Sequence, residues 1–178
     1  MSRLTFIRHG QANSSAKDEV SYDQLSPLGH QQAGWLGAHF AQTEDHFDQV
    51  YCGTLSRHLE TARGIFPTGE DNFVQDTRFN EMAYFTLAQL LYEQQGITVP
   101  DDRDGFCQHL PRMFTAWADN EIANAPESFP SFESRVKAAL HDIAATGTSA
   151  MVVTSGGVLG MIKKPKMSTS TLNPSKAL

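Results

Sequence analysis

Short apolar runs alternate along this chain with segments whose apolar residues recur at helical spacing. The runs at 4–7, 49–52 and 150–153 have the length and composition of buried strands, and a weaker run lies at 73–75. Helical spacing dominates the region at about 82–146. Alternation of this kind is typical of α/β proteins. The sequence therefore predicts a mostly parallel central sheet flanked by helices, with a helical insertion at about 82–146.

Residue types typical of helix ends locate some of these helices. Ser26 followed by Pro27 is a common helix start, so a helix is expected from there to about residue 42. In the insertion, apolar residues at helical spacing predict one helix around 106–117. Ser131 is expected to cap a further helix that leads into the last strand.

The 178 residues fit one domain with a core of its own. Hydrophobic residues make up 40% and charged residues 19%, which favours a globular protein over a disordered one. A single domain is expected over 1–162. The polar segment at 163–178 lacks any periodicity, and we expect it to be a disordered tail.

Charge and cysteine content exclude several classes of protein. The net charge is −6, and the lysine-containing tail makes residues 1–162 more acidic still, so no nucleic-acid partner is expected. Cys52 and Cys107 form no CxxC motif, which argues against a disulfide framework or a zinc site. No apolar run approaches the roughly 18 residues of a membrane span, and no signal peptide is evident. A cytoplasmic protein without a membrane partner is expected.

Polar residues and glycines follow the predicted strands at their carboxyl ends. Ligands bind at that edge of parallel sheets, so these residues are expected to converge there. Arginine forks and helix N-terminal amides bind phosphate, and a histidine among them can act as a nucleophile or base. Taken singly, a strand-end histidine is as often bonded to a backbone carbonyl, and a lone helical arginine is more often solvated. The residues concerned are Arg8, His9, Gly10, Arg57, Glu81 and the turn Ser155-Gly156-Gly157.

Three motifs occur in a recognisable order. Residues 4–12 read Leu-Thr-Phe-Ile-Arg-His-Gly-Gln-Ala. Residues 25–33 are similar to Leu-Thr-x-x-Gly-x-x-Gln-Ala, with serine in place of the threonine, and residues 53–62 are similar to Ser-x-Leu-x-Arg-Ala-x-x-Thr-Ala. Phe79-Asn80-Glu81 stands where a Leu-x-Glu motif would follow. Over roughly 3–162 the chain thus resembles the histidine phosphatase superfamily, also called phosphoglycerate mutase-like, and in particular its small phosphatase branch.

The resemblance implies a role for each matching residue. His9 would attack phosphorus and become phosphohistidine, while Arg8 and Arg57 would bind the phosphoryl oxygens. Glu81 would protonate the leaving group and then activate water. The implied activity is phosphomonoester hydrolysis with no metal and no cofactor, on a phosphorylated small molecule or a phosphoprotein. Sugar phosphates, nucleotide phosphates and phosphohistidine proteins all remain candidate substrates, and the oligomeric state is unassigned.

The turn after the last predicted strand departs from the family pattern. The family has a second histidine there, and Ser155 stands in its place. Loss of one donor to a developing anion typically costs ~10²–10³ in rate. The Ser155 hydroxyl and the Gly156 amide are expected to supply part of that donation, so reduced activity is expected. The alternative is a catalytically weak or inactive module that binds phosphate or a phosphorylated partner.

Smaller expectations concern the flanks of these motifs. Gln11 and Asn13 are candidates for substrate binding, although solvated loop residues are the competing interpretation. Arg78 could attract a substrate, but it is expected to pair with Glu81. Aromatic side chains either line the mouth of the site or belong to the core, and these are Tyr84, Phe85 and Tyr92. Family members continue with a longer helix and a further strand or two. Here the polar tail follows, so either the C-terminal edge of the sheet is incomplete or the chain is a shortened form.

Overall fold

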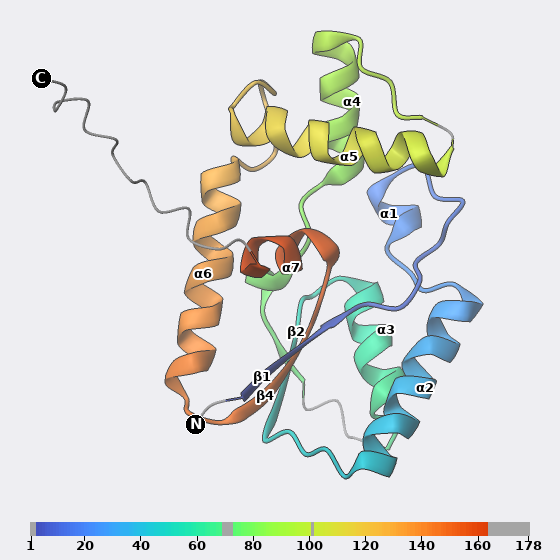
Figure 1. Cartoon of the computed structure of the whole chain (residues 1–178), viewed down its shortest axis with the longest axis vertical. Coiled ribbons are helices and arrows are strands. Elements are labelled where there is room, and N and C mark those ends of the chain that lie inside the picture. Colours follow the sequence, from blue (N-terminus) through green and yellow to red (C-terminus); the bar gives the residue numbers. More distant parts are fainter. Residues whose placement is uncertain (1–2, 69–72, 101, 164–178) are drawn as a thin grey trace, which may run out of the picture.

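The computed structural model describes residues 3–68, 73–100 and 102–163, and these form a four-stranded sheet with helices on both faces (Figure 1). All strand pairs are parallel, and β4 lies between β1 and β2, which β3 extends. This arrangement confirms the predicted α/β fold. The strands are β1 (Arg3–Arg8), β2 (Gln49–Cys52), β3 (Val74–Gln75) and β4 (Ser149–Thr154).

Strand β4 is the most buried element and separates two apolar layers. Because side chains alternate along a strand, Ala150 and Val152 face one layer while Met151 and Val153 face the other. Helices α2 (Pro27–Thr43) and α3 (Ser56–Ile65) belong to the second layer. Helices α6 (Phe129–Ala145) and α7 (Gly156–Lys163) belong to the first. The sheet is therefore covered on both faces, as a parallel sheet requires.

The start of α2 agrees with the prediction, whereas the start of α6 does not. Ser26 caps α2 and accepts a hydrogen bond from the Gly29 amide. Helix α6 begins one turn earlier than expected, and its cap is Ser128, which accepts from the amide of Ser131. The predicted cap at Ser131 is therefore wrong. The earlier start places Phe129 within the first turn, where its ring packs edge-on against Trp117.

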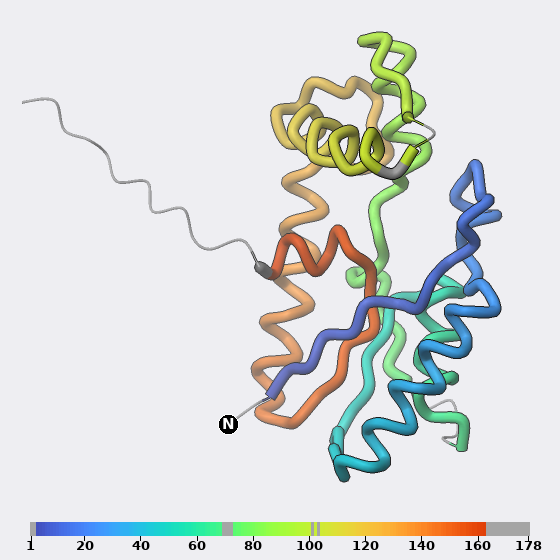
Figure 2. Tube along the Cα trace, turned by 45° about the vertical axis from the view of Figure 1, so that its right-hand side comes forward, coloured from blue at the N-terminus to red at the C-terminus, as the bar shows by residue number. Residues whose placement is uncertain are grey.

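The remaining helices stand beyond the carboxyl ends of the strands. Helices α4 (Tyr84–Gln95) and α5 (Arg103–Ala118) form a separate tier there, while α6 runs alongside the sheet (Figure 2). Phe132, Val136 and Ile143 of α6 join the core around β4. The predicted insertion at 82–146 is thus too long at its C-terminal end, because α6 covers the sheet. Two short elements, α1 (Glu19–Tyr22) and η1 (Thr77–Phe79), complete the described chain.

The two edge strands of the described sheet are β1 and β3. Among the described residues no further strand pairs with the outer side of β1. The tail predicted from residue 163 lies almost wholly outside the described residues, which end there. No helix in the described ranges is long and apolar enough to cross a membrane.

Candidate active site

A cavity of about 1840 Å³ opens where the carboxyl ends of the strands meet the tier formed by α4 and α5. Its polar end is made by residues from four separate segments of the chain. The structure therefore brings together most of the residues that the sequence placed at this edge. They are Arg8, His9, Arg57, Glu81, Gly156 and Gly157.

His9 follows β1 directly and is held by the sheet itself. Its backbone N–H donates to the Thr154 carbonyl at 2.9 Å, which continues the β1–β4 ladder. Its Nδ1 lies 2.7 Å from the Gly10 carbonyl oxygen. A carbonyl oxygen only accepts, so Nδ1 carries the proton and Nε2 keeps its lone pair.

The electrostatic surroundings of His9 keep it uncharged. Burial lowers its pKa to about 4, and the positive charges of Arg57 and Arg8 act in the same direction. The Gly10 hydrogen bond opposes this shift without cancelling it. At neutral pH the side chain is therefore a neutral imidazole with a free lone pair, which is the form of histidine that attacks an electrophile.

Arg57 is buried at the start of α3, with only 5% of its surface exposed. Asp23 accepts hydrogen bonds from both its backbone N–H and its Nη1, at 3.2 and 3.0 Å. The guanidinium lies 5.1 Å from the centre of the Tyr22 ring. Its Nε–H is buried and has no acceptor among the described residues. Buried donors are almost always paired, so this group is suited to an anion in the cavity.

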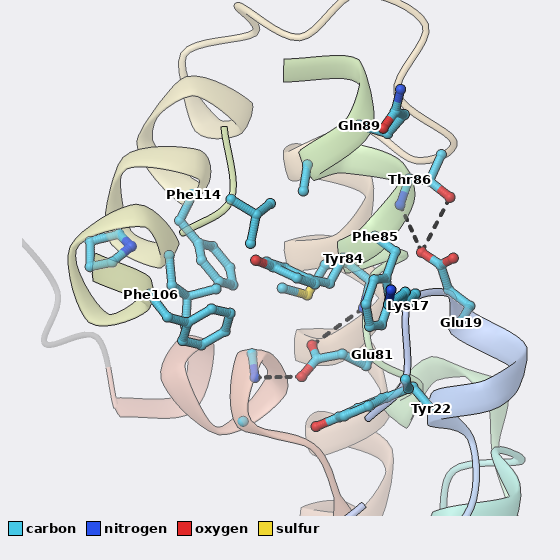
Figure 3. A pocket seen from close by; sticks show the side chains of 18 of the residues that line it. Lys17, Glu19, Tyr22, Glu81, Tyr84, Phe85, Thr86, Gln89, Phe106 and Phe114 are labelled. Carbon is cyan, nitrogen blue, oxygen red and sulfur yellow. Dashed lines mark hydrogen bonds between the residues drawn. The ribbon is translucent and has the colours of Figure 1, made fainter. Parts of the chain in front are cut away.

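Glu81 reaches the cavity from the segment after η1, which β4 holds in place. Thr154 at the end of β4 donates its hydroxyl to the Phe79 carbonyl at 2.7 Å. The Glu81 carboxyl accepts from the Gly157 amide at 2.8 Å and from the Met82 amide at 3.3 Å (Figure 3). The carboxyl is thus fixed at the N-terminus of α7.

Burial raises the pKa of Glu81 above its ordinary value. The amide of Gly157 and the charges of Arg57 and Arg8 oppose this shift but do not outweigh it. A carboxyl group with a raised pKa holds its proton at a higher pH than an ordinary glutamate does. Such a group can donate a proton and later accept one.

Aromatic rings form the wall of the cavity beyond this polar end (Figure 3). Tyr84 meets Phe85 edge-on at 5.4 Å and Phe106 at 5.7 Å between ring centres. Phe114 lines the same side. Tyr84 both lines the cavity and packs against the apolar core, so each of its two interpretations holds in part. The cavity can therefore hold a phosphate at one end and an apolar group at the other.

Comparison with known proteins agrees with this geometry. The family model for the histidine phosphatase superfamily (branch 1) matches residues 4–167. The chain belongs to this superfamily. The resemblance predicted from the sequence is therefore confirmed. Membership of this superfamily supports an enzyme of the phosphatase type that acts on phosphoesters. A search of curated proteins found no match.

Solved structures show the same fold at low sequence identity. A phosphoglycerate mutase from Bacillus anthracis is 20% identical with a TM-score of 0.63, over 90% of this chain and 78% of that one. A phosphoserine phosphatase from Entamoeba histolytica is 18% identical with a TM-score of 0.60, over 91% and 78%. An alpha-ribazole phosphatase from Shigella flexneri is 22% identical with a TM-score of 0.56, over 90% and 77%.

The position of the missing superfamily histidine has an unexpected neighbour. Ser155 is 1% exposed, and its hydroxyl oxygen lies 2.6 Å from Nε2 of His58. The sequence motifs do not single out His58, although it stands beside Arg57 where the superfamily segment has alanine. That departure is the signal in the sequence that could have found it.

The smaller candidates have partners within the protein. Gln11 accepts from the Ser26 hydroxyl through its side-chain oxygen at 2.7 Å. The side-chain Nδ2 of Asn13 donates to the Ser21 carbonyl at 2.9 Å, and Asn13 also lines the cavity. Both side chains shape the loop after β1. Their contact with a substrate stays a prediction.

The predicted pairing of Arg78 with Glu81 is wrong. Arg78 donates to Asp76 and to Asp142, with the shortest distance 2.7 Å in each case. Asp76 precedes Arg78 by two residues, and Asp142 lies on α6. The Arg78 side chain therefore pairs with both carboxylates outside the cavity. Within the described ranges, no group of three or more histidine, cysteine or acidic residues is placed to hold a metal ion.

Proposed function

We propose that this chain hydrolyses phosphomonoesters through a phosphohistidine formed on His9, without a metal ion. One observation carries the proposal. A neutral histidine with a free Nε2 shares its cavity with a buried arginine donor that lacks an acceptor among the described residues, and with a carboxyl group of raised pKa. A phosphate ester suits all three groups. Its phosphorus is an electrophile for the histidine, its oxygens are anionic acceptors for the arginine, and its ester oxygen can take the proton of the carboxyl group.

The first step transfers the phosphoryl group to the protein. The lone pair on His9 Nε2 forms the N–P bond while the bond between phosphorus and the ester oxygen breaks. The proton of Glu81 moves to the departing oxygen, which leaves as an alcohol. Arg8 and Arg57 stabilise the charge on the remaining phosphoryl oxygens.

The second step releases phosphate. Glu81, now a carboxylate, takes a proton from a water molecule as the water oxygen bonds to phosphorus. The N–P bond breaks and its electron pair returns to Nε2. Inorganic phosphate leaves, and both His9 and Glu81 are restored to their starting forms.

The substrate we propose is a small phosphorylated molecule whose organic part contacts the aromatic wall. Solved structures with this fold include a phosphoserine phosphatase in complex with phosphoserine and with 3-phosphoglyceric acid. An aryl phosphate offers a flat apolar group to Tyr84 and Phe106, so it is a suitable first probe. The two free cysteines are consistent with the cytoplasmic location that the sequence predicts.

Hydrolysis of an aryl phosphate, with a chelator present, tests the proposal. The parent protein is expected to turn over and to incorporate acid-labile phosphate, while His9→Ala does neither. The melting temperature of both proteins controls for folding. If the parent protein were as inert as His9→Ala, the proposed phosphatase activity would be refuted. If inorganic phosphate then raised the melting temperature of that inert protein, the chain would be a phosphate-binding module instead.

A further inference from the structure

Beside the nucleophile lies a buried pair of polar side chains that the steps above do not use. His58 on α3 is 0% exposed, and its Nε2 lies 2.6 Å from the hydroxyl oxygen of Ser155. The centre of its ring is 5.8 Å from that of His9, with the two planes inclined by 35°. The pair joins residues 97 positions apart in the chain. A fully buried histidine thus lies directly beside the ring of His9.

The partners of His58 determine where its proton resides. Burial lowers the pKa of His58 to about 2, and the charge of Arg57 adds to this, so the ring is neutral and carries one proton. Nδ1 is buried and has no partner among the described residues. A buried N–H without an acceptor is rare, so the proton sits on Nε2 and is donated to the Ser155 oxygen.

This assignment leaves the Ser155 hydroxyl proton free. In the described ranges that hydroxyl makes no other hydrogen bond. Ser155 follows Thr154, whose carbonyl holds the His9 amide, and precedes Gly156, against which the Arg8 guanidinium lies. The free proton thus belongs to a buried residue directly before Gly156, which lines the cavity together with Arg8 and His9.

We propose that His58 is a positioning residue, which holds the Ser155 hydroxyl as a hydrogen-bond donor to the phosphoryl oxygens at His9. A hydroxyl that accepts one hydrogen bond becomes a stronger donor of its own proton. The pair thereby supplies the donor that a histidine at position 155 would give. This inference rests on the proposed function, because it assigns the donor within that same site.

The backbone near His58 provides independent support. A Cβ atom on Gly53 would lie 2.2 Å from His58 Nδ1 and 2.6 Å from Asn80 Oδ1, so a larger residue at 53 would force the His58 ring to shift. In the superfamily segment, serine stands at position 53, alanine at 58 and histidine at 155. Gly53 lies beside the Nδ1 edge of the His58 ring, and the Ser155 hydroxyl lies beside the Nε2 edge.

Three variants test the inference through catalysis. Ser155→Ala removes the donor, and we expect kcat on an aryl phosphate to fall about 10²-fold. His58→Leu fills the volume but cannot donate, and we expect a loss of at least about tenfold. His58→Gln keeps an N–H near the position of Nε2, and its kcat is expected to stay within about threefold of the parent. In the Ser155→Ala background, His58→Leu should cause no further loss.

A titration with inorganic phosphate gives a readout that does not need turnover. Ser155→Ala and His58→Leu should each weaken phosphate binding about tenfold, and His58→Gln should not. If His58→Leu matched the parent in both kcat and phosphate affinity, the inference would be wrong. Equal losses for His58→Gln and His58→Leu, with lowered melting temperatures, would show a structural role instead. Failure of the enzyme itself appears separately, as a parent no faster than His9→Ala.

Discussion

The position of the Glu81 carboxyl depends on the absence of a side chain at Gly157. A Cβ atom at this position would lie 2.2 Å from Oε1 of Glu81. Contacts of real Cβ atoms are rarely shorter than 3.0–3.4 Å, and the atom that meets it is the end of a flexible side chain. In Gly157→Ala the carboxyl group therefore moves by about 1 Å, while the protein keeps all of its ionisable groups.

A displacement of about 1 Å costs about 10²-fold when it affects a reacting group. The loss should depend on the leaving group, because the role proposed for Glu81 is proton donation in the first step. An alkyl phosphate needs the proton and should lose about 10² in kcat/KM, which is within the range for acid catalysis. A nitrophenyl phosphate leaves as a stable anion, so its kcat/KM should fall much less.

Steady-state kinetics on the two esters provides the assay, and Gly34→Ala provides the control. Gly34 lies in helix α2 and does not line the cavity, and among the described residues no atom stands within 4 Å of the place that a Cβ would take there. The control should keep the kcat/KM of the parent on both esters, with a melting temperature equal or higher. An equal loss on both esters, or none on the alkyl ester, would refute the assigned position and role of Glu81.

Three further predictions address charge, intermediates and specificity. Below about pH 4 the His9 imidazole becomes protonated, so kcat/KM should fall. On an alkyl phosphate kcat/KM should also fall as the pH rises above the raised pKa of Glu81, and a pH profile with its acid limb at pH 6 or 7 would contradict the role of His9. Glu81→Gln cannot accept the proton of water, so the phosphoprotein should accumulate and be visible by mass spectrometry; its absence after a product burst would contradict the second step. Phe106→Ala should raise KM for aryl phosphates several-fold and leave KM for small alkyl phosphates unchanged, because it removes only apolar wall; equal effects on both would exclude that wall from substrate contact.

The alternation of strands and helices was predictable because it is encoded locally. The run at 4–7, the cap at Ser26 and the helical spacing in α5 each depend on residues close together in the chain. The order of motifs around His9 and Arg57 identified the superfamily in the same way. Where two local signals competed, the sequence did not determine the exact start of the helix. Ser128 and Ser131 are both good caps, and packing of Phe129 on Trp117 favours the earlier one.

The sequence by itself determined which side chains can carry the chemistry, since strand ends and motif spacing specify them. Only the tertiary structure decided their partners. Asp23 orients Arg57, the Gly157 amide holds Glu81, and His58 reaches Ser155 across the fold. These contacts join segments far apart in the chain, so no local pattern encodes them. Burial likewise exists only in the folded state, and burial is what neutralises His9 and raises the pKa of Glu81.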